Sequence, residues 1–265
     1  MPYATNEGVR IYYEVEGSGP PLVLLIGFLG SLDDWRREDV GYTAALREAY
    51  HLVLVDPRGQ GRSDGPHDPA AYEPRRRVGD VLAVLDAEGI PRAHCWGYSM
   101  GGLTGFALGA YAQDRVASLV VGGATPFPPE MLPPEDEDTW LRLFRQGMPA
   151  FVADWEARDP LMPPAMRSRW LALHAAAVAA AWEARRRYDR RLVDALPGIR
   201  TPTLIYYGAD DFPDALPERA AERMPDATVV ALEGLNHSQA FRRSDLVLPH
   251  VHVFLDRVTA PDIGQ

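Results

Sequence analysis

Gly97-Tyr98-Ser99-Met100-Gly101-Gly102 is the segment that most strongly indicates how this chain folds. An apolar run, residues 93–97, predicts a strand before it, and a small-residue run, 100–111, predicts a helix after it. The flanking glycines permit a tight strand-to-helix turn that exposes the serine hydroxyl and aims the Met100 amide at a developing oxyanion. The stretch therefore predicts that Ser99 is a nucleophile. The alternative interpretation is a glycine-rich turn with an incidental serine.

Apolar runs alternate with longer amphipathic stretches on both sides of this turn, which predicts successive βα units and a mainly parallel sheet. The expected strands are residues 9–15 (an N-terminal hairpin or edge strand), 22–26, 51–55, 93–97, 116–121, 203–207 and 228–232. The expected helices of the α/β part are residues 33–48, 72–85, 100–111, 217–224 and 246–257.

One segment interrupts this alternation. A proline-rich stretch, residues 126–134, and an acidic run, 135–138, precede a region that is helical in pattern to about residue 194. We therefore expect a first part of an α/β core at residues 1–125, an all-helical insertion at 126–199 and the second part of the core at 200–265.

The composition excludes several functions. The chain has 265 residues, a net charge of −10 and no basic stripe, which argues against nucleic acid as a partner. It contains no lysine, so neither a Schiff-base lysine nor a P-loop lysine is available. Cys95 is the single cysteine, so no intramolecular disulfide can form. With no visible secretory signal and no apolar run of about 18 residues, we expect a cytoplasmic protein without a membrane partner.

A serine hydroxyl needs a base, and the base needs a carboxylate that fixes its tautomer. His237 is the one histidine of seven in a loop directly after an expected strand, and ligand chemistry collects at that edge of a parallel sheet. The alternative role for it is a structural hydrogen bond within the loop. Asp210, Asp211 and Asp214 follow the strand at 203–207, and spacing alone leaves the choice between the first two open.

At this point the sequence resembles the α/β-hydrolase superfamily along nearly its whole length, and within it the esterase, lactonase and methylesterase branch with a small helical cap. The resemblance rests on five stretches that occur in the order of the family: Leu24-Leu25-Ile26-Gly27-Phe28; Asp56-Pro57-Arg58-Gly59-Gln60-Gly61-Arg62-Ser63; Gly97 to Gly102; Pro202-Thr203-Leu204-Ile205 leading to Gly208-Ala209-Asp210-Asp211; and Gly234-Leu235-Asn236-His237.

The resemblance implies an α/β-hydrolase fold, a mainly parallel eight-stranded sheet flanked by helices, with residues 126–199 as a cap. It selects Asp211 as the acid, in the family's chain order of serine, aspartate and histidine. It also implies an oxyanion hole of the Phe28 and Met100 backbone N–H groups, and no cofactor or metal.

Two details qualify this resemblance. The family commonly has a histidine before the oxyanion glycine, where this chain has Ile26, so we expect the oxyanion loop to be held differently. The loop at residues 56–63 is expected to be structural: Asp56 bonds amides of its own turn, and Arg58 is an ion-pair partner rather than a catalytic residue.

The expected function is cofactor-independent hydrolysis of a carboxylic ester (a carboxylesterase-like enzyme) by Ser99, His237 and Asp211. A lactonase or a carbon–carbon bond hydrolase would use the same residues, and a receptor-like protein with slow turnover is a further alternative. The expected partner is a small ester or lactone with an apolar part. Some of the following residues are expected to line its pocket, although most cap aromatics would only pack the cap onto the core: Leu29, Trp96, Tyr98, Trp140, Phe144 and Trp155.

Overall fold

The computed structural model describes residues 3–127, 134–159, 162–185, 190–212 and 214–259. They contain an eight-stranded sheet in the order β1-β2-β4-β3-β5-β6-β7-β8. An antiparallel hairpin forms one edge, and β2 also pairs antiparallel with β4, whereas the six strands from β4 to β8 run parallel. The strands are β1 (Tyr3–Asn6), β2 (Val9–Glu16), β3 (Pro21–Leu25), β4 (His51–Val55), β5 (Ala93–Tyr98), β6 (Val116–Gly122), β7 (Thr203–Gly208) and β8 (Ala227–Leu232).

The apolar runs of the central strands supply two separate cores, because successive side chains of a strand point to opposite faces. In β3, Val23 and Leu25 join one buried cluster, and Leu22 and Leu24 join the other. Both faces are covered, so the strand is apolar at every position rather than at alternate ones.

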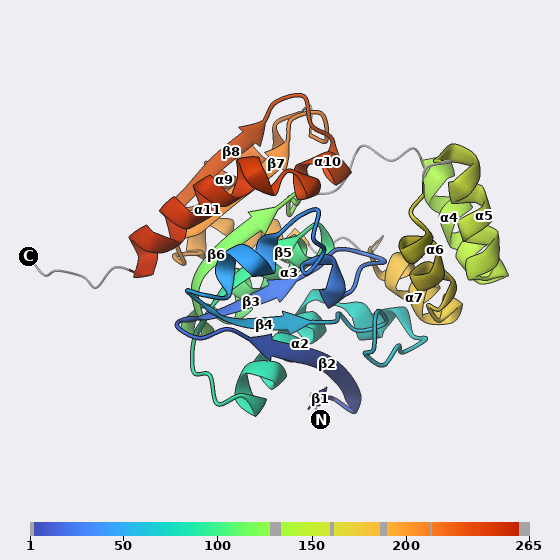
Figure 1. The fold of residues 1–265 in the computed structure, drawn as a ribbon, viewed down its shortest axis with the longest axis horizontal. Helices are drawn as coiled ribbons and strands as arrows, with labels where there is room; N and C mark the ends of the chain where they lie inside the picture. The colour runs from blue at the N-terminus through green and yellow to red at the C-terminus, as the bar shows by residue number, and fades with distance from the viewer. Residues whose placement is uncertain (1–2, 128–133, 160–161, 186–189, 213, 260–265) are drawn as a thin grey trace, which may run out of the picture.

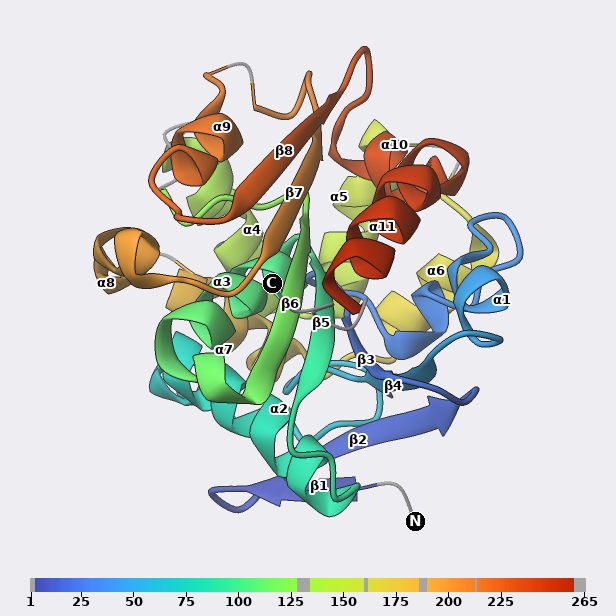
Figure 2. The same cartoon turned by 90° about the vertical axis from the view of Figure 1, so that its left-hand side faces the viewer.

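Helices cover the two faces (Figure 2). One face carries α1 (Tyr42–Leu46), α10 (His237–Arg242) and α11 (Ser244–Thr259). The other carries α2 (Pro74–Ala87), α3 (Met100–Tyr111), α8 (Arg190–Ala195) and α9 (Leu216–Ala221). Together with the sheet, these layers give the expected α/β architecture.

The helix expected at residues 33–48 is wrong. Only a 3-10 turn, Leu32–Asp34, and the short α1 form there. Gly41, which precedes α1, has φ +65°, and this left-handed conformation interrupts a helix. Trp35 is fully buried among Tyr42, Trp96 and Phe241, so tertiary packing decides the path of this segment.

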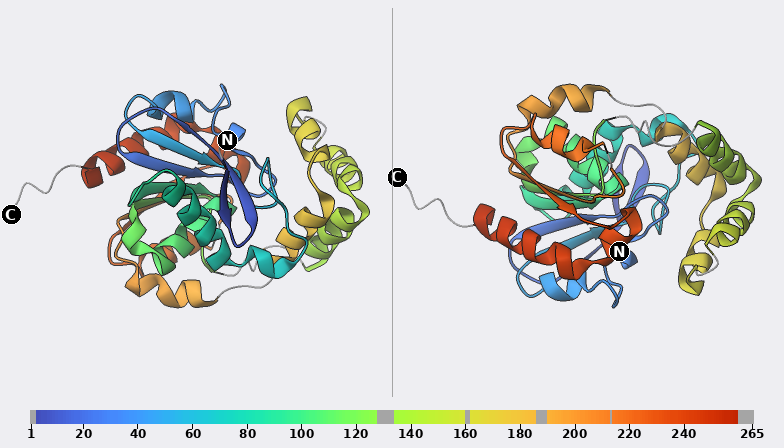
Figure 3. Two further views of the ribbon diagram at one scale, coloured as in Figure 1. Left: turned by 90° about the horizontal axis from the view of Figure 1, so that it is seen from below. Right: turned by 90° about the horizontal axis from the view of Figure 1, so that it is seen from above.

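Four helices between β6 and β7 stand together beyond one end of the sheet (Figures 1 and 3). They are α4 (Pro134–Gln146), α5 (Met148–Arg158), α6 (Pro164–Leu171) and α7 (Ala175–Arg185), which we call the cap helices. The next helix, α8, packs on the core instead, where Leu192 joins the cluster of α3. The cap helices lie at the carboxyl ends of the parallel strands. Leu29, just after β3, is therefore buried among the aromatic residues of these helices.

Within the described ranges, no helix is both long enough and apolar enough to cross a membrane.

Candidate active site

Ser99 stands alone between β5 and α3 in a strained conformation, with φ 55° and ψ −117°. A side chain on either flanking glycine would collide with backbone: a Cβ on Gly97 would lie 2.1 Å from the Gly101 carbonyl oxygen, and a Cβ on Gly101 would lie 2.1 Å from that of Leu25. The strand and the helix therefore approach as closely as the sequence predicts, and the partly exposed serine is left at the turn between them.

The loop after β3, residues 26–34, lies against this serine, and we call it the oxyanion loop. A Cβ on Gly27 would lie 3.0 Å from Ser99 Cβ, so glycine permits the approach. In the described part of the chain, neither Phe28 N–H nor Met100 N–H donates to any of the turn and loop acceptors. Met100 is the first residue of α3, where an amide has no partner within the helix. Among the described backbone hydrogen bonds, neither of these two N–H groups has an acceptor.

His237 and Asp211 meet after β8 and β7. His237 Nδ1 lies 2.5 Å from Asp211 Oδ2. His237 begins α10, and its orientation is supported by a capping box, in which Asn236 Oδ1 accepts from Gln239 N–H at 3.0 Å and Gln239 Oε1 accepts from Asn236 N–H at 2.9 Å. Asp210 is exposed to solvent and makes no described side-chain bond to the ring. The imidazole thus has one carboxylate, from the position that the family resemblance selects.

The serine and the histidine approach the same turn, Gly122-Gly123, at the end of β6. Ser99 N–H donates to Gly122 O at 2.8 Å, and a Cβ on Gly123 would lie 3.2 Å from His237 Cε1. The described hydrogen bonds include none between Ser99 Oγ and the His237 ring. In unliganded sites such bonds are often long and tighten only when substrate binds. The structure therefore gathers Ser99, His237 and Asp211 at the carboxyl ends of β5, β8 and β7.

Tyr98 contacts both the backbone and the ring of His237. Its hydroxyl donates to His237 O at 2.5 Å, its ring lies 5.3 Å from the imidazole ring, and only 4% of the residue is exposed. Burial raises the pKa of this phenol well above its usual value, so it remains a donor. The pocket-lining role expected for Tyr98 is thus replaced by a contact with the backbone of His237.

The other residues expected to line a pocket divide into two groups. Trp96 is wholly buried in the core, where its Nε1–H donates to Tyr206 OH at 3.1 Å, so its expected contact with substrate is wrong. Leu29 and Phe144 are buried inside the cap cluster, whereas Trp140 and Trp155 are partly exposed at it. Phe28, which is expected to contribute only its backbone amide, places its ring 5.3 Å from that of Trp182.

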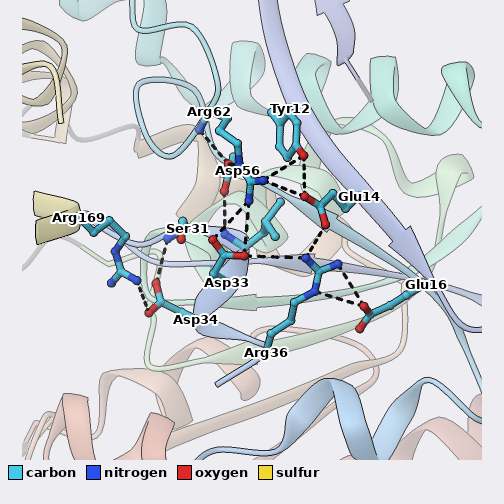
Figure 4. Close-up of polar contacts among 11 residues, drawn as sticks. Tyr12, Glu14, Glu16, Ser31, Asp33, Asp34, Arg36, Asp56, Arg62 and Arg169 are labelled. Carbon is cyan, nitrogen blue, oxygen red and sulfur yellow. Dashed lines mark hydrogen bonds and ion pairs between the residues drawn. The ribbon is translucent and has the colours of Figure 1, made fainter. Parts of the chain in front are cut away.

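The loop at residues 56–63 is structural, as expected. Asp56 is fully buried and accepts from Leu32 N–H at 2.7 Å and from Arg62 N–H at 2.8 Å, joining this loop to the oxyanion loop (Figure 4). Burial raises the pKa of Asp56, and the two amides and the Arg62 charge oppose that shift. Arg58 pairs with Asp80 inside the protein.

The sequence indicates no role at the oxyanion loop for two residues that both bond to Leu29: Gln60 in the loop at residues 56–63 and Trp170 in α6. Gln60 lies in a stretch expected to be structural, and Trp170 is one of several aromatic residues within 126–199 that the sequence alone does not rank. The described ranges contain no group of three or more histidine, cysteine or carboxylate side chains that could hold a metal ion.

Comparison with known proteins gives a consistent result. Residues 20–192 match the model of the alpha/beta hydrolase fold family. A protein of Variovorax paradoxus, provisionally named as the carbamate hydrolase RutD, is 32% identical over 96% of this chain and 98% of its own length. A non-heme chloroperoxidase of Streptomyces lividans is 29% identical over 95% and 98%. The crystal structure of the enol-lactonase from Burkholderia xenovorans superposes with a TM-score of 0.80, at 28% identity, over 96% of this chain and 99% of that one.

Proposed function

This chain belongs to the alpha/beta hydrolase fold family, and we propose that it is a cofactor-independent serine hydrolase that cleaves a carboxylic ester through an acyl-enzyme. The hydrolase class follows from its relatives. The ester substrate, the triad and the oxyanion hole are the proposal.

In the proposed mechanism Ser99 Oγ attacks the ester carbonyl while His237 Nε2 takes its proton. Asp211, bound to Nδ1 on the other side of the ring, holds the reactive tautomer and stabilises the imidazolium. The Phe28 and Met100 N–H groups bind the oxyanion. His237 then protonates the leaving alcohol, and a water that it activates releases the acid from Ser99.

One observation carries this proposal. A serine in a strained turn lies beside the Gly122-Gly123 turn that also touches His237, and His237 holds a carboxylate 2.5 Å away. Strain at a residue with a Cβ persists only where the surroundings impose it, and such residues cluster at active sites. A merely structural turn would have no need of the imidazole, the carboxylate and two unpaired amides at one edge of the sheet.

A lactone is the second candidate substrate. The enol-lactonase of known structure shares this fold at 28% identity over nearly the whole chain. Ring opening needs the same nucleophile, base and oxyanion donors, since a lactone is a cyclic ester whose leaving alcohol stays attached to the acyl group.

The first test is a panel of p-nitrophenyl esters of short and medium acyl chains, with lactones and an aryl carbamate beside them. We expect turnover of esters that is abolished in Ser99→Ala and in His237→Ala. Ser18→Ala, in an exposed turn that is distant from Ser99 in the sequence, is the matched control and should retain full activity.

A fluorophosphonate followed by mass spectrometry of the intact protein and its peptides tests the nucleophile directly. One adduct on Ser99, absent in Ser99→Ala, supports the proposal. Ligand-induced thermal stabilisation without turnover or adduct would contradict it and favour a receptor-like protein.

A further inference from the structure

The oxyanion loop contains a conformation that it cannot hold by itself. Leu29 has φ +63°, which lies in the left-handed region that residues with a Cβ rarely adopt. Inside the loop, a single described backbone bond spans Leu29, from Gly30 N–H to Gly27 O at 3.2 Å; the other, from Asp34 N–H to Ser31 O at 2.9 Å, lies beyond it. Ile26, where the resemblance leads one to expect histidine, is apolar and cannot bond to the loop. Other residues must therefore fix this backbone.

Gln60 holds the loop from the core side. Its Nε2 donates to Gly27 O at 3.3 Å, and its Oε1 accepts from Leu29 N–H. These two bonds enclose Phe28 between them, and Gln60 is only 2% exposed. The Gly27–Phe28 peptide is planar and trans, so its N–H points away from its carbonyl oxygen. A side chain that holds the Gly27 carbonyl on one side therefore fixes the Phe28 N–H on the other.

The cap holds the same loop from the opposite side through two consecutive residues of α6. Trp170 Nε1–H donates to Leu29 O at 3.0 Å. Arg169 Nη1 lies 2.9 Å from Asp34 Oδ1, and the other oxygen of Asp34 accepts from Ser31 N–H at 2.9 Å (Figure 4). Leu29 is thus bonded through its N–H to the core and through its carbonyl to the cap.

We propose that Gln60 and Trp170 are positioning residues of the oxyanion hole, which together direct the Phe28 N–H toward the oxygen of a bound carbonyl. Gln60 replaces the loop-organising histidine that the family commonly has before Gly27. Because Trp170 belongs to the cap, the geometry of the oxyanion hole depends on how the cap packs against the core. This inference rests on the proposed serine chemistry.

Gln60→Met tests the core side, because it keeps the length of the side chain and removes both bonds. We expect kcat to fall about 10- to 100-fold, toward the loss caused by removing one oxyanion donor, while KM changes little. Affinity for a trifluoromethyl ketone, whose adduct with Ser99 carries the oxyanion, should fall by the same factor.

Gln113→Met is the matched control. Gln113 also binds two backbone groups with one side-chain amide: it donates to Gly198 O at 3.0 Å and accepts from Arg200 N–H at 2.7 Å. These contacts join η3 (Gln113–Arg115) to the segment just before β7. It should lower thermal stability without changing kcat or the affinity for the ketone.

Trp170→Phe tests the cap side, because it keeps an aromatic ring and removes the N–H donor. One net hydrogen bond corresponds to a loss of kcat of about 3- to 10-fold. Trp35→Phe is its control, since Trp35 is also buried and its Nε1 has no hydrogen-bond partner among the described residues.

Folded Gln60→Met with wild-type kcat and wild-type affinity for the ketone would overturn the inference. Should that variant fail to fold, Trp170→Phe decides in its place by the same two measurements. A wild-type protein with neither ester turnover nor a Ser99 adduct would instead overturn the proposed function, and the inference with it.

Discussion

Two adjacent carboxylates follow β7, and their neighbours distinguish them. Asp211 N–H donates to Gly208 O at 2.9 Å, and this tight turn carries the Asp211 side chain to His237 Nδ1. Asp210 N–H donates to Leu235 O at 3.1 Å, and its side chain is left in solvent. The two residues are the same amino acid in the same loop, so they differ only in where their side chains point.

Asp211→Asn should lower kcat by about 10³- to 10⁴-fold, because an amide supports the wrong tautomer of His237 and cannot stabilise its cation. Asp210→Asn is the matched control and should change kcat little. Steady-state kinetics on a p-nitrophenyl ester measures both, and a large loss in Asp210→Asn alone would reverse the assignment.

At the scale of elements, the crossing of β5, α3 and β3 requires glycine. Gly101 lies where the first turn of α3 passes over the end of β3, and the nearest atoms to an added Cβ belong to the backbone of Leu25 and Ile26. Backbone cannot rotate away as a flexible side chain would. The elbow glycines thus set the distance between Ser99 and the loop at residues 26–34.

Gly101→Ala should destabilise the fold by about 3 kcal/mol, the upper end of the usual cost of overpacking, and should misplace Ser99. Gly198→Ala is the control, because a Cβ there would meet nothing within 4 Å and Gly198 has no positive φ. Urea unfolding followed by circular dichroism compares the two, and equal midpoints would contradict the proposed crowding.

The loop at residues 56–63 is joined to α2 by a buried ion pair. Arg58 Nε donates to Asp80 Oδ2 at 2.6 Å, a second nitrogen also bonds to that carboxylate, and the guanidinium bonds to the carbonyls of Ala71 and Arg76. Its side chain is 1% exposed. The donors of Arg58 are therefore used for structure, in agreement with the expected ion-pair role.

Arg58→Met should cost about 3 to 5 kcal/mol of unfolding free energy, because it leaves the Asp80 carboxylate buried without its partner. Arg58→Met combined with Asp80→Leu should recover much of that loss. Arg10→Met breaks the exposed pair with Asp64 and should have little effect. A double variant no more stable than Arg58→Met would exclude an unpaired charge as the cause.

At the scale of the whole molecule, the single cysteine reports on global unfolding. Cys95 lies in the central strand β5, is 1% exposed, and burial raises the pKa of its thiol to about 12. The thiolate, which is the reactive form, is therefore scarce at ordinary pH, and reagents reach the sulfur only when the sheet opens.

In the native protein, alkylation of Cys95 should be at least about 10³-fold slower than in denaturant, as expected for a domain of ordinary stability. Ser18→Cys adds an exposed thiol that should react at once and serves as the control. Mass spectrometry counts the labels over time. Rapid native labelling of Cys95 would show that β5 opens without global unfolding.

Local patterns along the chain were enough to predict the layers of the fold and the order of the site residues. Apolar runs and glycine turns are local signals, so they predicted seven strands, the α3 helix, the inserted helices and the positions of Ser99 and His237. The resemblance selected Asp211 where spacing left two candidates. The order of the segments then required all three residues to lie at the carboxyl ends of parallel strands.

The partners of side chains that are distant in the sequence depend on how the elements pack together. In the structure, only a short helix forms within residues 33–48, and Trp96 lies in the core. The Tyr98 hydroxyl bonds to His237 O, and Gln60 and Trp170 both bond to Leu29. Trp170 lies 141 positions from Leu29 in the sequence, and no periodicity spans such a distance. Hydrophobic patterns determine which face of an element is buried, whereas hydrogen-bond partners depend on how the buried faces pack together.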